Sequence, residues 1–320
     1  MCWRSSILVF LFLLTACRDK EATPPVVEEA PVQLAAGYYN PHALIEPTEL
    51  MNLEGKEHIS IIDFRKREDF DKGHIPGAIP IWRTDIEDRD APVRGLIASR
   101  EAMESLLSGL GISSEDTLVV YDDRGGVDAA RLWWVLQVYG FDKTRLLNGG
   151  LQHWESQNGP LSTDHTSFPP KTFRFEGPGR PSLRIEKDRV LALLDNPEWL
   201  LIDTRSADEY SGKRQKEGAA AAGRIPGSIN IDWAEAVHYH KDMTFRSVED
   251  LRKKYRRIPE NPDQPIIAYC HSGVRSAHTS FVLTQLLGYQ EVHNYDGSWL
   301  EWSTFAGAPI EKDSVTSILN

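Results

Sequence analysis

The feature that most constrains this sequence is an internal repeat. Four pairs of segments match in the same order: residues 61–65 with 201–205, 73–79 with 223–229, 118–122 with 266–270, and 150–154 with 298–302. The last two pairs keep one offset of 148 residues, and the second copy is longer by ten residues within 212–222. Several matches in one order are not expected by chance, so the chain holds two copies of one domain.

Each copy alternates short apolar, β-branched runs with helical patterns, which predicts an α/β fold with a parallel sheet flanked by helices. In the second copy, the run 265–270 is typical of a buried strand. Residues 276–287 have helical periodicity, and Gly288 is a typical C-terminal stop. Cys270 is therefore expected where a strand ends and shortly before a helix begins.

The first residues resemble an export signal. Met1-Cys2-Trp3-Arg4 precedes an apolar run over 7–14, which is too short for the ~20 residues of a membrane span. Leu14-Thr15-Ala16-Cys17 resembles the bacterial lipoprotein signal, in which Cys17 becomes the lipidated N-terminus; a plain secretory signal is the alternative. Arg18, in place of Asp, favours the outer membrane over the inner, with the protein facing the periplasm.

Residues 18–37 are acidic and rich in proline, and they carry few large apolar groups, so they are expected to form a tether. The segment over 162–181 is rich in Pro and Gly and is interpreted as a linker. The predicted organisation is a signal peptide over 1–16, a lipidated tether over 17–37, an N-terminal domain over 38–161, the linker over 162–181 and a C-terminal domain over 182–320.

Charge and cysteine content narrow the function. The chain of 320 residues has 36 basic and 47 acidic residues and a net charge of -11, which opposes binding to nucleic acid. Of its 3 cysteines, Cys2 leaves with the signal peptide and Cys17 is blocked by lipid. Cys270 is then the one free thiol of an exported protein, where unpaired thiols are unusual; a buried, inert Cys is the alternative.

The neighbours of Cys270 favour a reactive thiol. Cys270-His271-Ser272-Gly273-Val274-Arg275 occupies the carboxyl end of a parallel strand, where α/β sheets bind ligands. A tight loop that runs into a helix directs backbone N–H groups inward and stabilises an anion. These amides and Arg275 are expected to lower the pKa of a solvent-open Cys270 thiol, so that the nucleophilic thiolate exists at neutral pH.

These segments resemble the rhodanese family in its tandem two-domain form. The resemblance rests on Asp203-Thr204-Arg205, on residues 224–228, on the Cys270 loop and on residues 297–302, and it covers essentially the whole mature chain. It implies a sulfurtransferase in which Cys270 carries a persulfide held by the amides of residues 271–275. The donor would be an anion such as thiosulfate, and the acceptor a thiol or cyanide. Asp122 replaces the cysteine in the N-terminal copy, which is therefore expected to be inactive.

Two other classes of function remain as alternatives. Phosphatases and arsenate reductases use a related loop with five residues between Cys and Arg, whereas four separate Cys270 from Arg275. A noncatalytic anion- or protein-binding module would not need Cys270. Sulfur transfer is favoured over both.

The donor is less well specified. The loop shares Ser272 and Gly273 with the mercaptopyruvate type, which usually has Thr where this chain has Arg275. Glu209 stands where the thiosulfate type and the mercaptopyruvate type both usually place an arginine that holds donor oxygens. Thiosulfate or another inorganic donor is favoured over 3-mercaptopyruvate, with Arg275 and His271 as its positive partners.

The remaining polar and aromatic candidates have structural interpretations. Asp63, Arg65, Asp203 and Arg205 are expected to form ion pairs, and Trp133, Trp134, Trp154 and Trp302 to pack in the core. His238, His240 and Asp242 are better explained by a solvated helix face than by a metal site. We expect no metal, no cofactor and a monomer.

Overall fold

The computed structural model describes residue 1 and residues 37–53 and 57–313. The predicted signal peptide, Cys17 and the tether up to residue 36 lie outside these ranges. Within them, no helix combines the length and the apolar character that a bilayer span requires.

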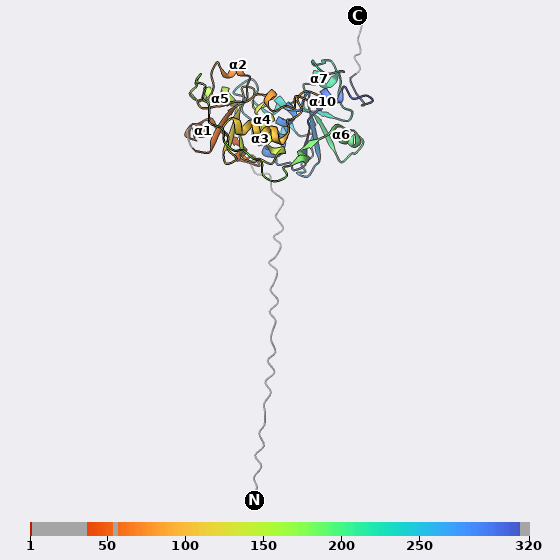
Figure 1. Ribbon diagram of the computed structural model, residues 1–320. Coiled ribbons are helices and arrows are strands. Elements are labelled where there is room, and N and C mark those ends of the chain that lie inside the picture. Colours follow the sequence, from red (N-terminus) through yellow and green to blue (C-terminus); the bar gives the residue numbers. More distant parts are fainter. Residues whose placement is uncertain (2–36, 54–56, 314–320) are drawn as a thin grey trace. The chain divides into compact units, whose positions relative to one another are not determined.

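The first copy of the repeat forms a parallel sheet of five strands in the order β1-β5-β4-β2-β3, coloured red to yellow-green in Figure 1. The strands are β1 (Leu44–Ile45), β2 (Ile59–Asp63), β3 (Ile79–Pro80), β4 (Thr117–Tyr121) and β5 (Thr144–Leu147). Its helices are α1 (Pro47–Leu53), α2 (Arg67–Phe70), α3 (Arg100–Gly109), α4 (Ala129–Val138) and α5 (Gly150–Ser156), with the 3-10 turns η1 (Pro41–Ala43) and η2 (Arg83–Asp85).

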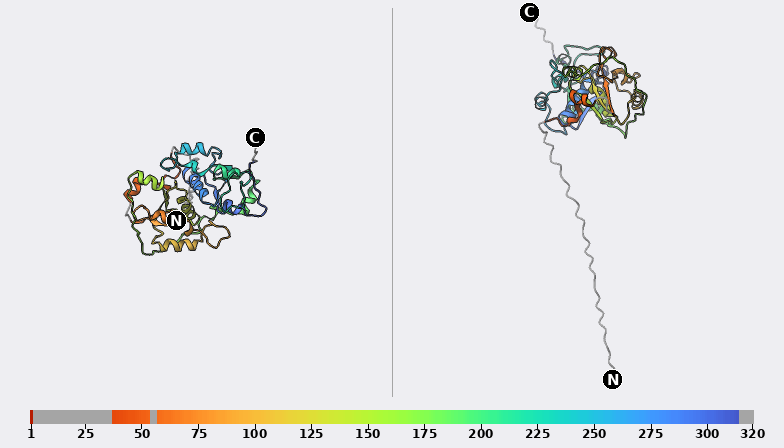
Figure 2. Two further views of the ribbon diagram at one scale, coloured as in Figure 1. Left: turned by 90° about the horizontal axis from the view of Figure 1, so that it is seen from above. Right: turned by 90° about the vertical axis from the view of Figure 1, so that its left-hand side faces the viewer.

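The second copy repeats this topology in the order β6-β10-β9-β7-β8, green to blue in Figure 1 and Figure 2. Its strands are β6 (Arg184–Ile185), β7 (Leu200–Asp203), β8 (Ile229–Asn230), β9 (Ile266–Tyr269) and β10 (Val292–Tyr295). Its helices are α6 (Lys187–Leu193), α7 (Ala207–Ser211), α8 (Val248–Lys254), α9 (Val274–Phe281) and α10 (Ser298–Trp302), with η3 (Pro181–Leu183), η4 (Trp233–Ala236) and the π-turn η5 (Val282–Leu286). The prediction of two tandem α/β domains, each with a parallel sheet flanked by helices, is confirmed.

Each sheet is covered on both faces because its central strands carry apolar side chains on both sides. In β4, Leu118 and Val120 join a large core cluster that includes α3 and α4. Val119 and Tyr121 point into a second cluster with residues of α1, α2 and α5. Strands buried on both faces have no polar side to alternate with, which is why the sequence shows continuous apolar runs here.

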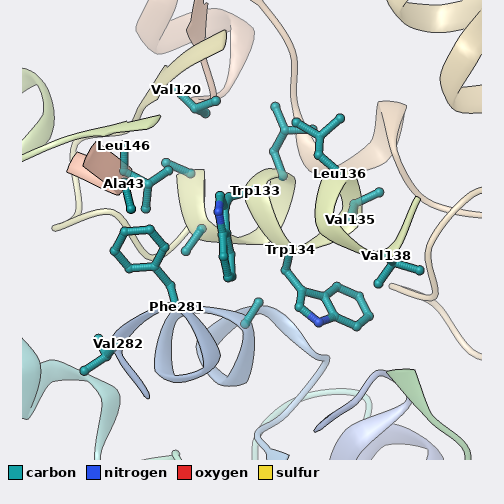
Figure 3. Close-up of a cluster of buried hydrophobic side chains, with 14 of the residues drawn as sticks. Ala43, Val120, Trp133, Trp134, Val135, Leu136, Val138, Leu146, Phe281 and Val282 are labelled. Carbon is teal, nitrogen blue, oxygen red and sulfur yellow. The ribbon is translucent and has the colours of Figure 1, made fainter. Parts of the chain in front are cut away.

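The two copies share the large core cluster. Trp133 of α4 meets Phe281 of α9 edge to face, with ring centroids 5.0 Å apart, and Figure 3 shows the two side chains directed at one another. The cluster continues from these helices into both sheets. The predicted core role of Trp133 and Trp134 is confirmed, as is that of Trp154 and Trp302, which are fully buried on the outer faces of the sheets.

Candidate active site

Cys270 directly follows β9, the middle strand of the second sheet. Gly273 ends the loop in the left-handed conformation, with φ 75°, and α9 begins at Val274. The predicted start of this helix at Ser276 is therefore two residues late. Arg275 lies in the first helical turn rather than in the loop, and Gly288 has φ 85° at the predicted helix end.

The Cys270 thiol is buried, with 1% of the residue exposed, so the expectation of a solvent-open sulfur is wrong. Its surroundings are nevertheless polar. Burial raises the thiol pKa, but Arg275, the hydroxyl and amide of Ser276 and the amide of Ser272 together lower it to about 7. Ser276 Oγ is itself buried and has no oxygen or nitrogen partner in the described part of the chain. These groups, called the cradle below, thus favour a thiolate at neutral pH.

Ser298, the first residue of α10, fixes the backbone of the loop. Its Oγ accepts hydrogen bonds from the amides of Cys270 and Gly273, each 3.1 Å long, and donates to the Tyr295 carbonyl at 2.7 Å. The Gly273 amide, predicted to hold substrate, is therefore already engaged. Ser298 is fully buried and has φ 50°, an unfavourable value for a residue with a Cβ atom.

Arg275 is bound by Glu209 of α7. Arg275 Nη1 and Nη2 donate to the two carboxylate oxygens at 2.7 and 2.9 Å, and both side chains are largely buried. Burial raises the pKa of Glu209, but Arg275 and Ser206 lower it to about 2, so the pair is ionised at neutral pH. Arg275 helps to lower the pKa of the Cys270 thiol, as expected. Its charge is paired with that of Glu209, and its role as a positive partner of the donor stays a prediction.

His271 is buried rather than exposed, and it is uncharged at neutral pH. Its Nε2 lies 3.1 Å from the Glu217 carbonyl, an acceptor only, so Nε2 carries the proton. Burial and the charges of Lys216 and Arg275 lower the pKa of His271 to about 4. The expectation that His271 supplies positive charge is therefore wrong.

The N-terminal copy shows the same cradle filled by a carboxylate. Asp122 Oδ1 accepts from the amides of Arg124 and Gly126 at 2.9 and 2.8 Å, and Oδ2 from those of Asp128 and Ala129 at 2.7 and 3.1 Å. At the repeat offset, Arg124 and Asp128 correspond to Ser272 and Ser276, whose amides act on Cys270. Both loops therefore have the geometry to bind an anion, and in one copy the chain supplies its own.

A side chain of α4 binds the loop before α9, and a side chain of α9 binds the loop before α4. Arg131 of α4 donates to the Gly273 carbonyl at 3.2 Å, to the Gly95 carbonyl at 2.7 Å and to Asp296 Oδ1 at 2.6 Å. In the opposite direction, His278 Nε2 of α9 lies 3.2 Å from the carbonyl of Gly125, the counterpart of Gly273. Sequence reasoning missed Arg131, His278 and Ser298, because nothing local marks a residue whose partner lies in another copy or another loop.

Two arginines have the predicted structural role. Arg65 binds Asp63, and Arg205 binds Asp203, through Nε and Nη2. Each arginine also donates to a glycine carbonyl of the following turn, Gly73 and Gly223 respectively, at 2.7 Å. The equivalence of these pairs explains why the motif appears in both copies of the repeat.

Known proteins match both the sequence and the fold. The family model described as Rhodanese-like domain matches residues 46–157 and 186–305, which fall within the two predicted domains. A putative thiosulfate sulfurtransferase of Mycobacterium tuberculosis is 41% identical over 252 residues, 77% of this chain and 88% of that protein. The sulfur carrier protein TtuD of Thermus thermophilus is 42% identical over 254 residues, 76% and 87% of the two chains.

Among solved structures, the anaerobic ergothioneine biosynthesis enzyme from Chlorobium limicola, in complex with trimethyl histidine, is similar with a TM-score of 0.72. It is 26% identical, and the match covers 85% of this chain and 71% of the other.

Proposed function

Because this chain belongs to the rhodanese family and is a sulfurtransferase, we propose that it moves a sulfane sulfur from thiosulfate to a thiol or cyanide through a Cys270 persulfide. The observation that carries the proposal is a buried thiol whose pKa is lowered to about 7 by Arg275, Ser276 and Ser272. A buried inert cysteine in apolar packing would have a raised pKa instead.

The first half-reaction loads the cysteine. The Cys270 thiolate attacks the outer sulfur of thiosulfate, a new S–S bond forms, and sulfite leaves with the electron pair of the broken S–S bond. The amides of Ser272 and Ser276 stabilise the negative charge at the sulfur, as the equivalent amides stabilise the Asp122 carboxylate. Ser276 Oγ has no other partner among the described residues and is free to donate to the same charge.

The second half-reaction unloads it. A thiolate or cyanide attacks the outer sulfur of the persulfide and takes it, and the Cys270 thiolate leaves with the bonding electron pair. The low thiol pKa helps this step because a more acidic thiol is a better leaving group.

The site favours thiosulfate over 3-mercaptopyruvate. An α-keto acid is best held by an arginine that binds its carboxylate through two parallel hydrogen bonds. Arg275 already makes that bidentate interaction with Glu209, at 2.7 and 2.9 Å. A compact inorganic anion needs no such fork, and several relatives are named putative thiosulfate sulfurtransferases.

The cellular location rests on the sequence alone. We propose that Cys17 is lipidated and that the enzyme faces the periplasm as a monomer, on the outer membrane in preference to the inner. Globomycin-sensitive processing and metabolic labelling of Cys17 with a fatty acid would test this, with Cys17→Ser as the unlabelled control.

Mass spectrometry of the purified protein tests the proposed function. After incubation with thiosulfate and removal of the excess, the peptide containing Cys270 should gain the mass of one sulfur atom, and cyanide should remove it. Cys270→Ser should gain nothing and keep its melting temperature. A phosphorylated Cys270, or no modification with any sulfur donor, would contradict the proposal.

A further inference from the structure

The segment 212–222, within which the second copy is longer by ten residues and which is called the extension below, lies against the Cys270 site. Its Glu217 carbonyl accepts from His271 Nε2 at 3.1 Å, and its Ala221 carbonyl accepts from Trp299 Nε1 at 2.8 Å. The amide of Ala220 donates to Ser303 Oγ at 3.0 Å, just beyond α10. His271 follows the nucleophile, and Trp299 binds the Cys270 carbonyl through its amide at 3.1 Å, so the extension is fixed to the residues around the sulfur.

Within the extension the chain forms a turn at residues 217–218, and Lys216 is the first residue of this turn. The amide of Ala219 donates to the Lys216 carbonyl at 3.2 Å, and Gln215 Nε2 donates to the Ala219 carbonyl at 2.7 Å. Ala219 is buried with the core residues of the second domain, while Lys216 remains exposed. Lys216 therefore stands on a fixed turn next to Glu217, which contacts the catalytic loop.

Three arginines near the Cys270 loop are each paired with a carboxylate. Arg275 is bound by Glu209, Arg131 by Asp296, and Arg83 by Asp128. Across residues 37–53 and 57–313, Lys216 forms no ion pair. A donor dianion that approaches Cys270 therefore meets in Lys216 a positive charge that is not bound to a carboxylate within these residues.

The charges of the site and of Lys216 act on one another. Partial desolvation and the charges of Arg275 and Arg83 lower the pKa of Lys216, whereas Glu209 and Cys270 oppose that shift. In return, Lys216 helps lower the pKa of His271. The neighbouring Lys213 is also exposed and lies on the same extension, which makes it a matched control.

From these contacts we propose that Lys216 is the donor-binding cation of this enzyme and that the 212–222 extension exists in the catalytic copy to present it. The proposal rests on the sulfurtransferase function and specifies its substrate class as small dianions with dispersed charge. The lysine ammonium group is a compact point charge and can contact the three oxygens of thiosulfate from any side. A carboxylate is instead bound best by the planar fork of an arginine.

Alkylation of Cys270 tests the proposal independently of sulfur transfer. The ratio of the rates for anionic iodoacetate and neutral iodoacetamide, read by mass spectrometry on the Cys270 peptide at one pH, reports the positive potential at the sulfur. Lys216→Met should lower this ratio by about 3- to 10-fold, the size of one charge interaction in a partly solvated site. Lys216→Arg and Lys213→Met should keep it. An unchanged ratio in Lys216→Met overturns the proposal.

Steady-state kinetics provide the second measurement. Lys216→Met should raise the KM for thiosulfate by about 3- to 10-fold and change kcat less, because a ground-state anion contact is lost. A fall in kcat with unchanged KM would also overturn the role. If the wild-type protein transferred no sulfur from any donor, the proposed function would fail, whereas the alkylation ratio would still decide the role of Lys216.

Discussion

Arg131 and Gly273 belong to different copies of the repeat, yet Arg131 Nη1 donates to the Gly273 carbonyl at 3.2 Å. Arg131 is 2% exposed, and its charge is balanced by Asp296. The N-terminal copy therefore holds the end of the Cys270 loop with a buried side chain whose Nη1 and Nη2 both donate hydrogen bonds.

Replacement of Arg131 should impair catalysis from outside the catalytic domain. We expect Arg131→Met to lower kcat/KM for thiosulfate by about 10- to 100-fold, since small displacements of a reacting group are costly. The midpoint of Cys270 alkylation against pH should also shift, which a loss of stability alone would not cause. The control is His278→Leu, which breaks the mirror contact to Gly125 and should cost stability with kcat/KM changed no more than about twofold. Equal kinetic effects in both variants would argue for a purely structural role.

The side-chain hydroxyl of Ser298 should contribute more to catalysis than its unusual backbone conformation does. Ser298→Gly relieves the unfavourable φ of 50° but removes the acceptor for the Cys270 and Gly273 amides. Gly150, the counterpart in the inactive copy, already has φ 59°, so the backbone conformation is accessible to glycine. We expect kcat/KM to fall by about 10-fold, the cost of roughly one to two hydrogen bonds, with little loss in melting temperature. Ser228→Ala removes another buried hydroxyl and should leave kcat/KM unchanged; similar kinetics for the two variants would refute the prediction.

The reactivity of Cys270 should follow a pKa of about 7. Its rate of alkylation by iodoacetamide should be half-maximal near pH 7 and fall about tenfold per unit below that, because only the thiolate reacts. Ser276→Ala should raise the midpoint by about half to one unit, equivalent to a hydrogen bond of about 0.5–1.5 kcal/mol. No other hydrogen bond of Ser276 Oγ within the described residues is lost in this variant. A midpoint near the free-cysteine value of about 8.5 in the wild type would contradict the polar cradle.

Removal of Glu209 should make the site more positive. In Glu209→Gln, Arg275 loses its counter-charge, and we expect a Cys270 midpoint below pH 7 and a lower KM for thiosulfate. The same carboxylate should give an acid-sensitive contribution to stability. Its folded-state pKa of about 2 lies below the unfolded value of about 4.3, so the contribution is present above about pH 4.3 and is lost as the pH falls towards 2. Urea unfolding of both proteins between pH 2 and 7 measures it; identical pH profiles would exclude the pair as a stabilising contact.

Loss of Asp122 should affect stability and spare catalysis. Asp122→Ala leaves four backbone amides, three of them in buried hydrogen bonds, without their acceptor, and we expect a decrease of about 3 kcal/mol in the free energy of unfolding. Asp122→Asn should cost less, because one amide oxygen still accepts. Below the unfolding transition, kcat/KM for thiosulfate should change by no more than about twofold in either variant. A large kinetic effect at full folding would assign the inactive loop a part in the reaction.

The sequence by itself determined the duplicated α/β fold and the position of Cys270 after a central strand. Both depend on local apolar patterns and on short motifs that recur along the chain. The two copies of the repeat can therefore be recognised without knowing which residues are in contact. It also indicated that the thiol would be acidic, because a strand, a tight loop and a helix in succession place amides around one point.

Only the tertiary structure decided how the charges of the site are distributed. Glu209 lies 66 residues from Arg275, and Arg131 lies 142 residues from Gly273, so neither pairing follows from neighbours in the chain. The burial of Cys270, the neutral state of His271 and the lack of an ion pair at Lys216 within the described residues likewise depend on how α7, α9 and the 212–222 extension pack. Sequence patterns record which faces are apolar, whereas the partner chosen by a buried polar group is set by the geometry in which those faces meet.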